Sequence, residues 1–174
     1  MNRMTLIAAA AAATAFASPA MAQDATAPAG FRVEGLVGYD RPGIDGFHSS
    51  GVLFGLGAGY DIALGNSVSL GIDAEATDSS AKKSGVSTGR DLYAGGRANF
   101  AVSPKANVYV KAGYTNARFK ESGFGGANFD GFRIGAGGQV IISGKAYVGA
   151  EYRYSNYQAG IDRHQVALTL GTRF

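Results

Sequence analysis

Hydrophobic and polar residues alternate along most of the chain after residue 30. In the run 51–62, for example, Phe54, Leu56 and Tyr60 alternate with Gly57 and Asp61. Successive side chains of a β-strand point to opposite faces, so this period of two predicts strands with one apolar and one polar face. Eight such runs are present, at 31–39, 51–62, 68–77, 90–102, 106–119, 131–141, 146–155 and from about 163 to the end. The pattern predicts an all-β protein.

The lengths of the runs and of their connections carry further information. Each run has about the nine to eleven residues that a tilted transmembrane strand needs. The connections at 63–67, 103–105 and 142–145 are short, whereas those at 40–50, 78–89, 120–130 and 156–162 are longer and more polar. This alternation is typical of outer-membrane barrels, which have short periplasmic turns and long extracellular loops. It places both termini of the chain at the periplasmic end of the barrel.

Alternation alone does not say which face of the sheet is the inner one. Most strand glycines lie on the polar face, and Gly35, Gly96 and Gly138 are the exceptions. Glycine weakens a solvated strand, but it fits the crowded lumen of an eight-stranded barrel. The polar face also carries few charges, unlike the Lys- and Glu-rich exterior of a soluble protein. We therefore expect the apolar face to contact lipid.

Aromatic residues on that outer face support this orientation, because aromatic girdles mark both interfaces of membrane barrels. The residues concerned are Tyr39, Tyr60, Phe100, Tyr114, Phe132, Tyr152, Tyr154 and Phe174.

The last ten residues end on an aromatic residue, with Val166, Leu168, Leu170 and Phe174 on one face. This segment resembles the closing strand of bacterial outer-membrane β-barrels, and the resemblance implies that these four residues form the signal read by the barrel insertion machinery. The region 31–174 as a whole resembles the small eight-stranded family of opacity proteins and the outer-membrane protein A barrel domain. The fold class implied is an eight-stranded antiparallel up-and-down transmembrane β-barrel.

The N-terminus is predicted to direct export. Arg3 precedes an apolar run that ends in Ala20-Met21-Ala22, which is the pattern of a secretory signal peptide spanning residues 1–22. An uncleaved anchor helix is the alternative, although the run is short for a membrane span. Residues 23–30 are expected to form a flexible tail before the barrel domain at 31–174. The predicted location is the bacterial outer membrane.

Charge and cysteine content limit the chemistry. The formal net charge is +3, or +2 without Arg3, which does not favour nucleic-acid binding. The chain has no cysteine, which excludes disulfides and thiolate chemistry. No metal-ligand cluster or phosphate-binding loop is present in the sequence, so we expect no cofactor.

Charged residues on the inner face predict a lumen filled by ion pairs, because buried charges are costly unless they are paired. We expect Asp73 and Glu75 to face Arg97, and Glu151 to face Lys111, Arg133 or Arg153. The predicted network comprises Glu34, Asp73, Glu75, Arg97, Lys111, Arg133, Glu151 and Arg153.

Three functions are compatible with such a barrel. The first is a structural or surface-interactive role, with outer-membrane lipid, lipopolysaccharide and a host or surface ligand at the loops as partners. The second is a small channel. The third is a lipid A-modifying enzyme, for which His164 near Ser155 or Asp162 is the candidate base, but no sharp catalytic motif is present and we expect no enzymatic activity.

Overall fold

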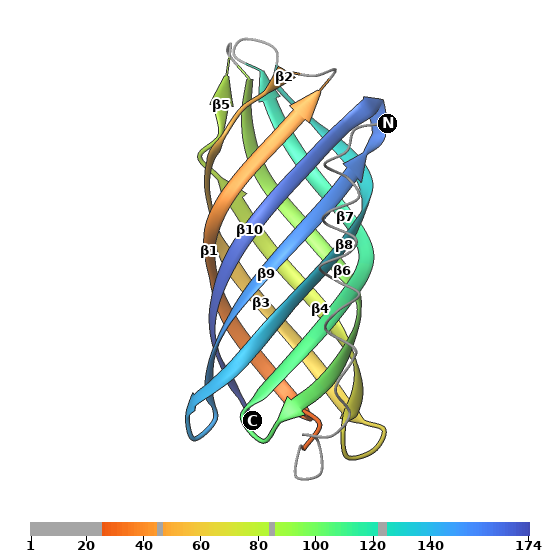
Figure 1. The fold of residues 1–174 in the computed structure, drawn as a ribbon. Helices are drawn as coiled ribbons and strands as arrows, with labels where there is room; N and C mark the ends of the chain where they lie inside the picture. Colours follow the sequence, from red (N-terminus) through yellow and green to blue (C-terminus); the bar gives the residue numbers. More distant parts are fainter. Residues whose placement is uncertain (1–25, 45–46, 84–85, 122–124) are drawn as a thin grey trace, which may run out of the picture.

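A computed structural model describes residues 26–44, 47–83, 86–121 and 125–174 of the chain, and almost all of them lie in strands (Figure 1). Eight long strands run antiparallel, each hydrogen-bonded to the next. They are β1 (Gly30–Ile44), β3 (Gly51–Ala63), β4 (Val68–Ser79), β6 (Val86–Ser103), β7 (Ala106–Glu121), β8 (Gly125–Ser143), β9 (Ala146–Tyr157) and β10 (Ile161–Arg173). The two-residue strands β2 (Phe47–His48) and β5 (Lys82–Lys83) pair with β1 and β6, and a 3-10 turn, η3 (Gln158–Gly160), precedes β10.

The sheet closes on itself, because β10 pairs with β1 along nearly its whole length, from Arg173 beside Arg32 to Ile161 beside Ile44. The last residue continues this contact. The Phe174 N–H donates to the Phe31 carbonyl over 2.8 Å, and the two rings lie 6.0 Å apart. Closure leaves no free edge among the eight long strands. The predicted fold class, an eight-stranded antiparallel up-and-down barrel, is confirmed.

The two ends of the barrel differ. The short turns at 64–67, 104–105 and 144–145 agree with the prediction and lie at the same end as the C-terminus (Figure 1). At the other end the strands extend further than expected: β7 continues to Glu121 and β8 begins at Gly125, inside the predicted loop at 120–130. That loop prediction was too long, because strand pairing uses backbone groups and tolerates polar and glycine-rich sequence.

The apolar residues face outward and the charged residues face inward, as predicted. Leu56 and Ile72 are each 70% exposed, whereas Arg133 and Arg153 are fully buried. The barrel therefore has an apolar exterior and a polar interior, which is the reverse of a soluble protein. An exterior of this kind is stable in hydrocarbon.

The glycines of the inner face lie where space is shortest, which confirms the steric reason for their position. A methyl group on Gly137 would lie 2.7 Å from Cζ of Tyr109, and one on Gly171 would lie 2.5 Å from Cζ of Tyr147. The outward Gly138, by contrast, would meet nothing closer than 3.6 Å.

The predicted signal peptide lies outside the described residues, as do residues 23–25 of the predicted tail. Of the remaining tail, Ala27 is buried and its N–H donates to the Asn66 carbonyl in the turn between β3 and β4, over 2.7 Å. No helix within the described ranges is long and apolar enough to cross a membrane.

Candidate functional site

The barrel lumen is the most distinctive site of the molecule, because charged side chains line it from end to end. Among the described residues, seven basic and seven acidic side chains face inward, so that their formal charges cancel. All are buried except Arg173, whose side chain is 17% exposed. The basic residues are Arg32, Arg97, Lys111, Arg133, Arg153, Arg163 and Arg173, and the acidic residues are Glu34, Asp40, Asp61, Asp73, Glu75, Asp91 and Glu151.

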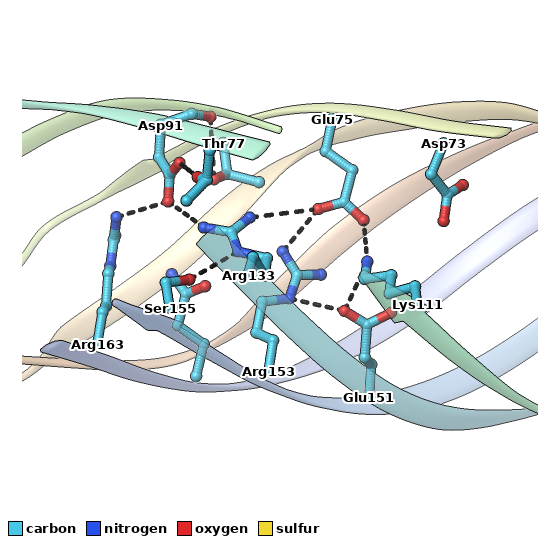
Figure 2. A network of polar contacts seen from close by, with 12 residues as sticks. Asp73, Glu75, Thr77, Asp91, Lys111, Arg133, Glu151, Arg153, Ser155 and Arg163 are labelled. Carbon is cyan, nitrogen blue, oxygen red and sulfur yellow. Dashed lines mark hydrogen bonds and ion pairs between the residues drawn. The ribbon is translucent and has the colours of Figure 1, made fainter. Parts of the chain in front are cut away.

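In the middle of the barrel, Glu75 and Glu151 share the cations of two strands, β7 and β9, and Glu75 also contacts a cation of β8 (Figure 2). Lys111 from β7 lies within ion-pair distance of both carboxylates, at 2.5 Å from Glu75 and 2.7 Å from Glu151. Arg153 also contacts both, at 2.8 Å each. Arg133 lies 3.7 Å from Glu75. Each carboxylate therefore has more than one cationic partner, which offsets the cost of burying it.

Towards the end of the barrel remote from the C-terminus, Asp91 is the centre of a second group of contacts (Figure 2). Arg133 pairs with Asp91 and donates to the Ser155 hydroxyl over 2.8 Å. Nη1 of Arg163 donates to Asp91 over 2.8 Å. Nε and Nη2 of the same side chain donate to the two carboxylate oxygens of Asp40, each over 2.7 Å. The Arg163–Asp40 contact is bidentate, the geometry in which arginine binds a carboxylate most strongly. It also joins β10 to β1, the two strands that close the barrel.

Towards the end that holds the C-terminus, Asp73 lies between two arginines. Arg97 donates to Asp73 over 2.9 Å, and Arg32 pairs with the other oxygen of the same carboxylate. Asp61 pairs with Arg173 and lies 3.6 Å from Arg32. The three groups of contacts together fill the lumen along its length.

Four tyrosines on the inner face complete the packing. Tyr109, Tyr147 and Tyr157 each donate to a carboxylate, namely Glu151 at 2.7 Å, Glu34 at 2.8 Å and Asp91 at 3.0 Å. The guanidinium of Arg97 lies 3.8 Å from the centre of the Tyr109 ring, which is a close cation–π contact. In addition, Tyr109 stands directly across from Gly137, so the tyrosine fills the space left by the glycine. The fourth is Tyr93.

An apolar cluster lies beyond Asp91, towards the end of the barrel remote from the C-terminus. Ala117, Tyr157 and Ile161 are buried there, and Phe119 and Phe129 pack against them. The Phe119 and Phe129 rings meet edge to face at 5.7 Å. The charged network is therefore covered by aromatic side chains at this end.

The structure brings all eight predicted network residues into the lumen but arranges some pairs differently. Arg97 contacts Asp73, as expected, whereas Glu75 contacts Lys111, Arg133 and Arg153 instead of Arg97. Glu151 contacts Lys111 and Arg153, two of its three expected partners.

The predicted network left out six residues that belong to it: Arg32, Asp40, Asp61, Asp91, Arg163 and Arg173. Asp40, Asp91 and Arg163 hold the part of the network remote from the C-terminus. Asp40 comes directly after the first expected strand, and Arg163 stands at the start of the last one. The alternation of inward and outward residues was not extended to these two positions. Asp40 continues the inward series that includes Arg32 and Glu34 in β1, so a longer count of alternate positions was the signal that could have found it.

The four residues of the predicted insertion signal lie on the outer face of β10. Val166, Leu168, Leu170 and Phe174 are between 48% and 63% exposed. They are therefore accessible from outside the barrel, and their role in insertion stays a prediction.

The residues weighed for catalysis are not assembled. Ser155 is buried in the lumen and accepts a hydrogen bond from Arg133. His164 lies on the outer face, where its Nδ1 is 2.6 Å from the Tyr152 hydroxyl and its Nε2 is 3.2 Å from Asp162. The barrel wall separates Ser155 from His164, so these two residues cannot act together as nucleophile and base.

An apolar exterior, an antiparallel closed sheet and a filled polar lumen define a small transmembrane β-barrel of the bacterial outer-membrane type. Comparison with known proteins supports the same class. The sequence profile of the outer membrane protein beta-barrel domain family matches residues 8–174, and the chain belongs to this family. No curated protein matches the chain.

Three solved structures are similar in fold. Neisserial surface protein A superposes with a TM-score of 0.64 and 15% identity, covering 83% of this chain and 97% of that one. Ail, the attachment invasion locus protein of Yersinia pestis, gives 0.60 and 18%, covering 84% and 100%. The N-terminal β-barrel domain of Pseudomonas aeruginosa OprF gives 0.56 and 18%, covering 82% and 97%.

Proposed function

We propose that this outer-membrane barrel is a closed, non-conducting and non-enzymatic protein with a structural and surface-interactive role. One observation carries the proposal: the inner face is filled by a charge-balanced set of buried side chains, with an apolar cluster above it. A lumen packed in this way holds no continuous column of water for ions to cross. The extracellular hairpins are then the part of the protein that meets other molecules.

Two of the structural neighbours are named for the cell surface or for attachment and invasion, which fits a role at the surface. We further propose that an N-terminal signal peptide exports the chain and that the insertion machinery reads Val166, Leu168, Leu170 and Phe174. Lipopolysaccharide and a host or surface ligand remain the proposed partners.

The first test of this function is conductance. Purified protein reconstituted in a planar lipid bilayer is expected to give no steady single-channel current, because the side chains of the middle layer occupy the lumen. A porin added to the same bilayer afterwards verifies that insertion and recording work. Folding is checked beforehand by the change in gel mobility on heating. A reproducible current step from the folded protein would contradict a closed barrel and support the channel alternative.

The second test is the orientation of the barrel in the cell. The chain has no cysteine, so a single introduced cysteine can be labelled selectively. Gln158 lies exposed in η3, and Gly65 lies exposed in the turn between β3 and β4 at the opposite end. A membrane-impermeant maleimide is expected to label Gln158→Cys on intact cells, and Gly65→Cys only after the outer membrane has been permeabilised. The reverse pattern would show that the hairpins proposed to be extracellular face the periplasm.

A further inference from the structure

A groove of about 300 Å³ lies on the outer face where β9, β10 and β1 meet. Its lining includes Tyr39 and Arg41 of β1, Tyr152 of β9, and His164 and Val166 of β10. The groove is on the lipid side of the wall, so it is separate from the lumen network. It lies in the extracellular half of the barrel, because Arg41 is close to the end of β1 that is remote from the C-terminus.

Arg41 gives the groove its charge. The side chain is exposed, and it forms no ion pair with any residue in the described parts of the chain. Its neighbour across the closing seam is His164, because the two residues pair directly between β1 and β10. Every other outward residue of β1 below Arg41 is uncharged. A guanidinium that has no ion-pair partner among the described residues can offer its donors to a phosphate group, whose geometry matches their fork.

His164 and its partners form the second wall of the groove. The Tyr152 hydroxyl is 2.6 Å from His164 Nδ1, and Asp162 is 3.2 Å from His164 Nε2. Both nitrogens of the ring are thus occupied, and the carboxylate of Asp162 contacts the histidine. The exposed rings of Tyr39 and Tyr152 stand on either side of Val166, since both residues pair with it. Tyrosines in this position are typical of the level of lipid headgroups.

Below the tyrosines the same seam is aliphatic. Val37 pairs with Leu168, and Gly35 pairs with Leu170 one step further down. Gly35 has no side chain to fill its position, and a methyl group there would meet nothing closer than 3.9 Å. Along the seam, a cation is therefore followed by aromatic rings at the level of the membrane interface. An aliphatic strip with a gap at Gly35 comes next, at the level of the hydrocarbon. This order matches the order of groups in a phosphorylated acyl lipid.

Resting on the orientation and the lipopolysaccharide partner of the proposed function, we propose that the groove on β9, β10 and β1 binds a phosphorylated acyl lipid of the outer leaflet. The phosphate contacts the Arg41 guanidinium, the adjoining headgroup packs against Tyr39 and Tyr152, and an acyl chain lies along Val37, Leu168 and the gap at Gly35. The occupant is a lipid of the surrounding membrane rather than free phosphate, because the aliphatic part of the seam continues directly from the charged part.

The test compares Arg41→Gln with Arg118→Gln. Arg118 is an exposed arginine of β7, outside the groove, so its replacement removes the same charge elsewhere on the extracellular half of the barrel. Each folded barrel, in a neutral detergent, is titrated with purified lipid A and with dephosphorylated lipid A, and bound lipid is measured by native mass spectrometry. Arg41→Gln is expected to weaken lipid A binding at least about tenfold, as the loss of a charge-assisted contact implies. Arg118→Gln is expected to bind like the unchanged protein.

Dephosphorylated lipid A should bind the unchanged protein and Arg41→Gln equally. Equal lipid A binding by Arg41→Gln and the unchanged protein would overturn the proposal, and so would an equal loss in Arg118→Gln. In the last experiment, inorganic phosphate is added at the concentration of the lipid. Displacement of lipid A by phosphate would show that the groove is an anion site without lipid selectivity, and it would overturn the proposal. Arg41 has no ion-pair partner in the described chain, so the variant is expected to keep the melting temperature of the unchanged protein without lipid.

Discussion

Replacement of Glu75 by glutamine is expected to lower the free energy of unfolding of the barrel by about 3–5 kcal/mol, the range measured when one partner of a buried ion pair is removed. Glu75 contacts Lys111 and Arg153 closely and Arg133 more distantly. Glutamine has nearly the same shape but no charge, so it leaves these cations with Glu151 and Asp91 as their acidic partners. The chain has no tryptophan, so unfolding in urea is best followed by far-ultraviolet circular dichroism and gel mobility.

A matched change on the same strand isolates the effect of burial. Asp78 of β4 is exposed on the outer side, and its carboxylate accepts a hydrogen bond from the Ser79 N–H. Asp78→Asn keeps an oxygen acceptor and is expected to change the stability by less than about 0.5 kcal/mol, as is usual for surface positions. Similar effects of Asp78→Asn and Glu75→Gln would contradict a tightly coupled lumen network.

A double variant adds a second control. Glu75→Gln combined with Lys111→Met removes one anion and one cation, and it is expected to be more stable than the sum of the two single changes predicts. If the losses in the free energy of unfolding were purely additive, Glu75 and Lys111 would not be energetically coupled.

Replacement of Leu56 by arginine is expected to destabilise the membrane-embedded barrel by about 2–4 kcal/mol, the cost measured for arginine on the lipid face at the bilayer midplane. Leu56 is 70% exposed and lies between Val52 and the girdle residue Tyr60 on the outer face of β3. Its exposure is to lipid, which does not solvate a guanidinium. The measurement is urea unfolding of the protein folded into lipid vesicles.

The control is the same substitution at an equally exposed leucine outside the membrane. Leu64 is 64% exposed in the turn between β3 and β4, beyond the ends of the two strands, where we expect the surrounding medium to be water. Leu64→Arg is expected to leave the stability within about 0.5 kcal/mol of the unchanged protein. The two leucines differ mainly in their solvent, so equal effects would argue against a lipid-facing exterior.

The Glu75 prediction concerns the inner face of the barrel wall, and the Leu56 prediction concerns its outer face. On the inner side, opposite charges cancel within the described lumen, so no net charge is buried there. On the outer side, the aliphatic and aromatic residues need a hydrocarbon solvent. A barrel wall one residue thick can satisfy both requirements only because successive side chains point to opposite faces. The alternation of the sequence is therefore the direct cause of the membrane location.

The path of the strands at the end of the barrel remote from the C-terminus was less predictable. Segment 120–130 was expected to be a loop because it is polar and rich in glycine, but most of it is paired strand, and Phe129 turns inward to pack on Phe119. Phe129 packs, partly buried, against other aromatic residues only because the neighbouring strands bring them together. The local sequence does not show that these aromatic rings meet.

Closure of the barrel was implied by the resemblance of the final segment to the closing strand of outer-membrane barrels. The sequence by itself determined most of the strands and the face that each residue occupies. These properties follow from local periodicity, which any reader of the chain can count. Only the tertiary structure decided which charges meet across the lumen, such as Arg163 with Asp40, which are 123 positions apart. The reason is that strand tilt and the relative shift of neighbouring strands set the height of each inward residue, and both are fixed only when the barrel closes.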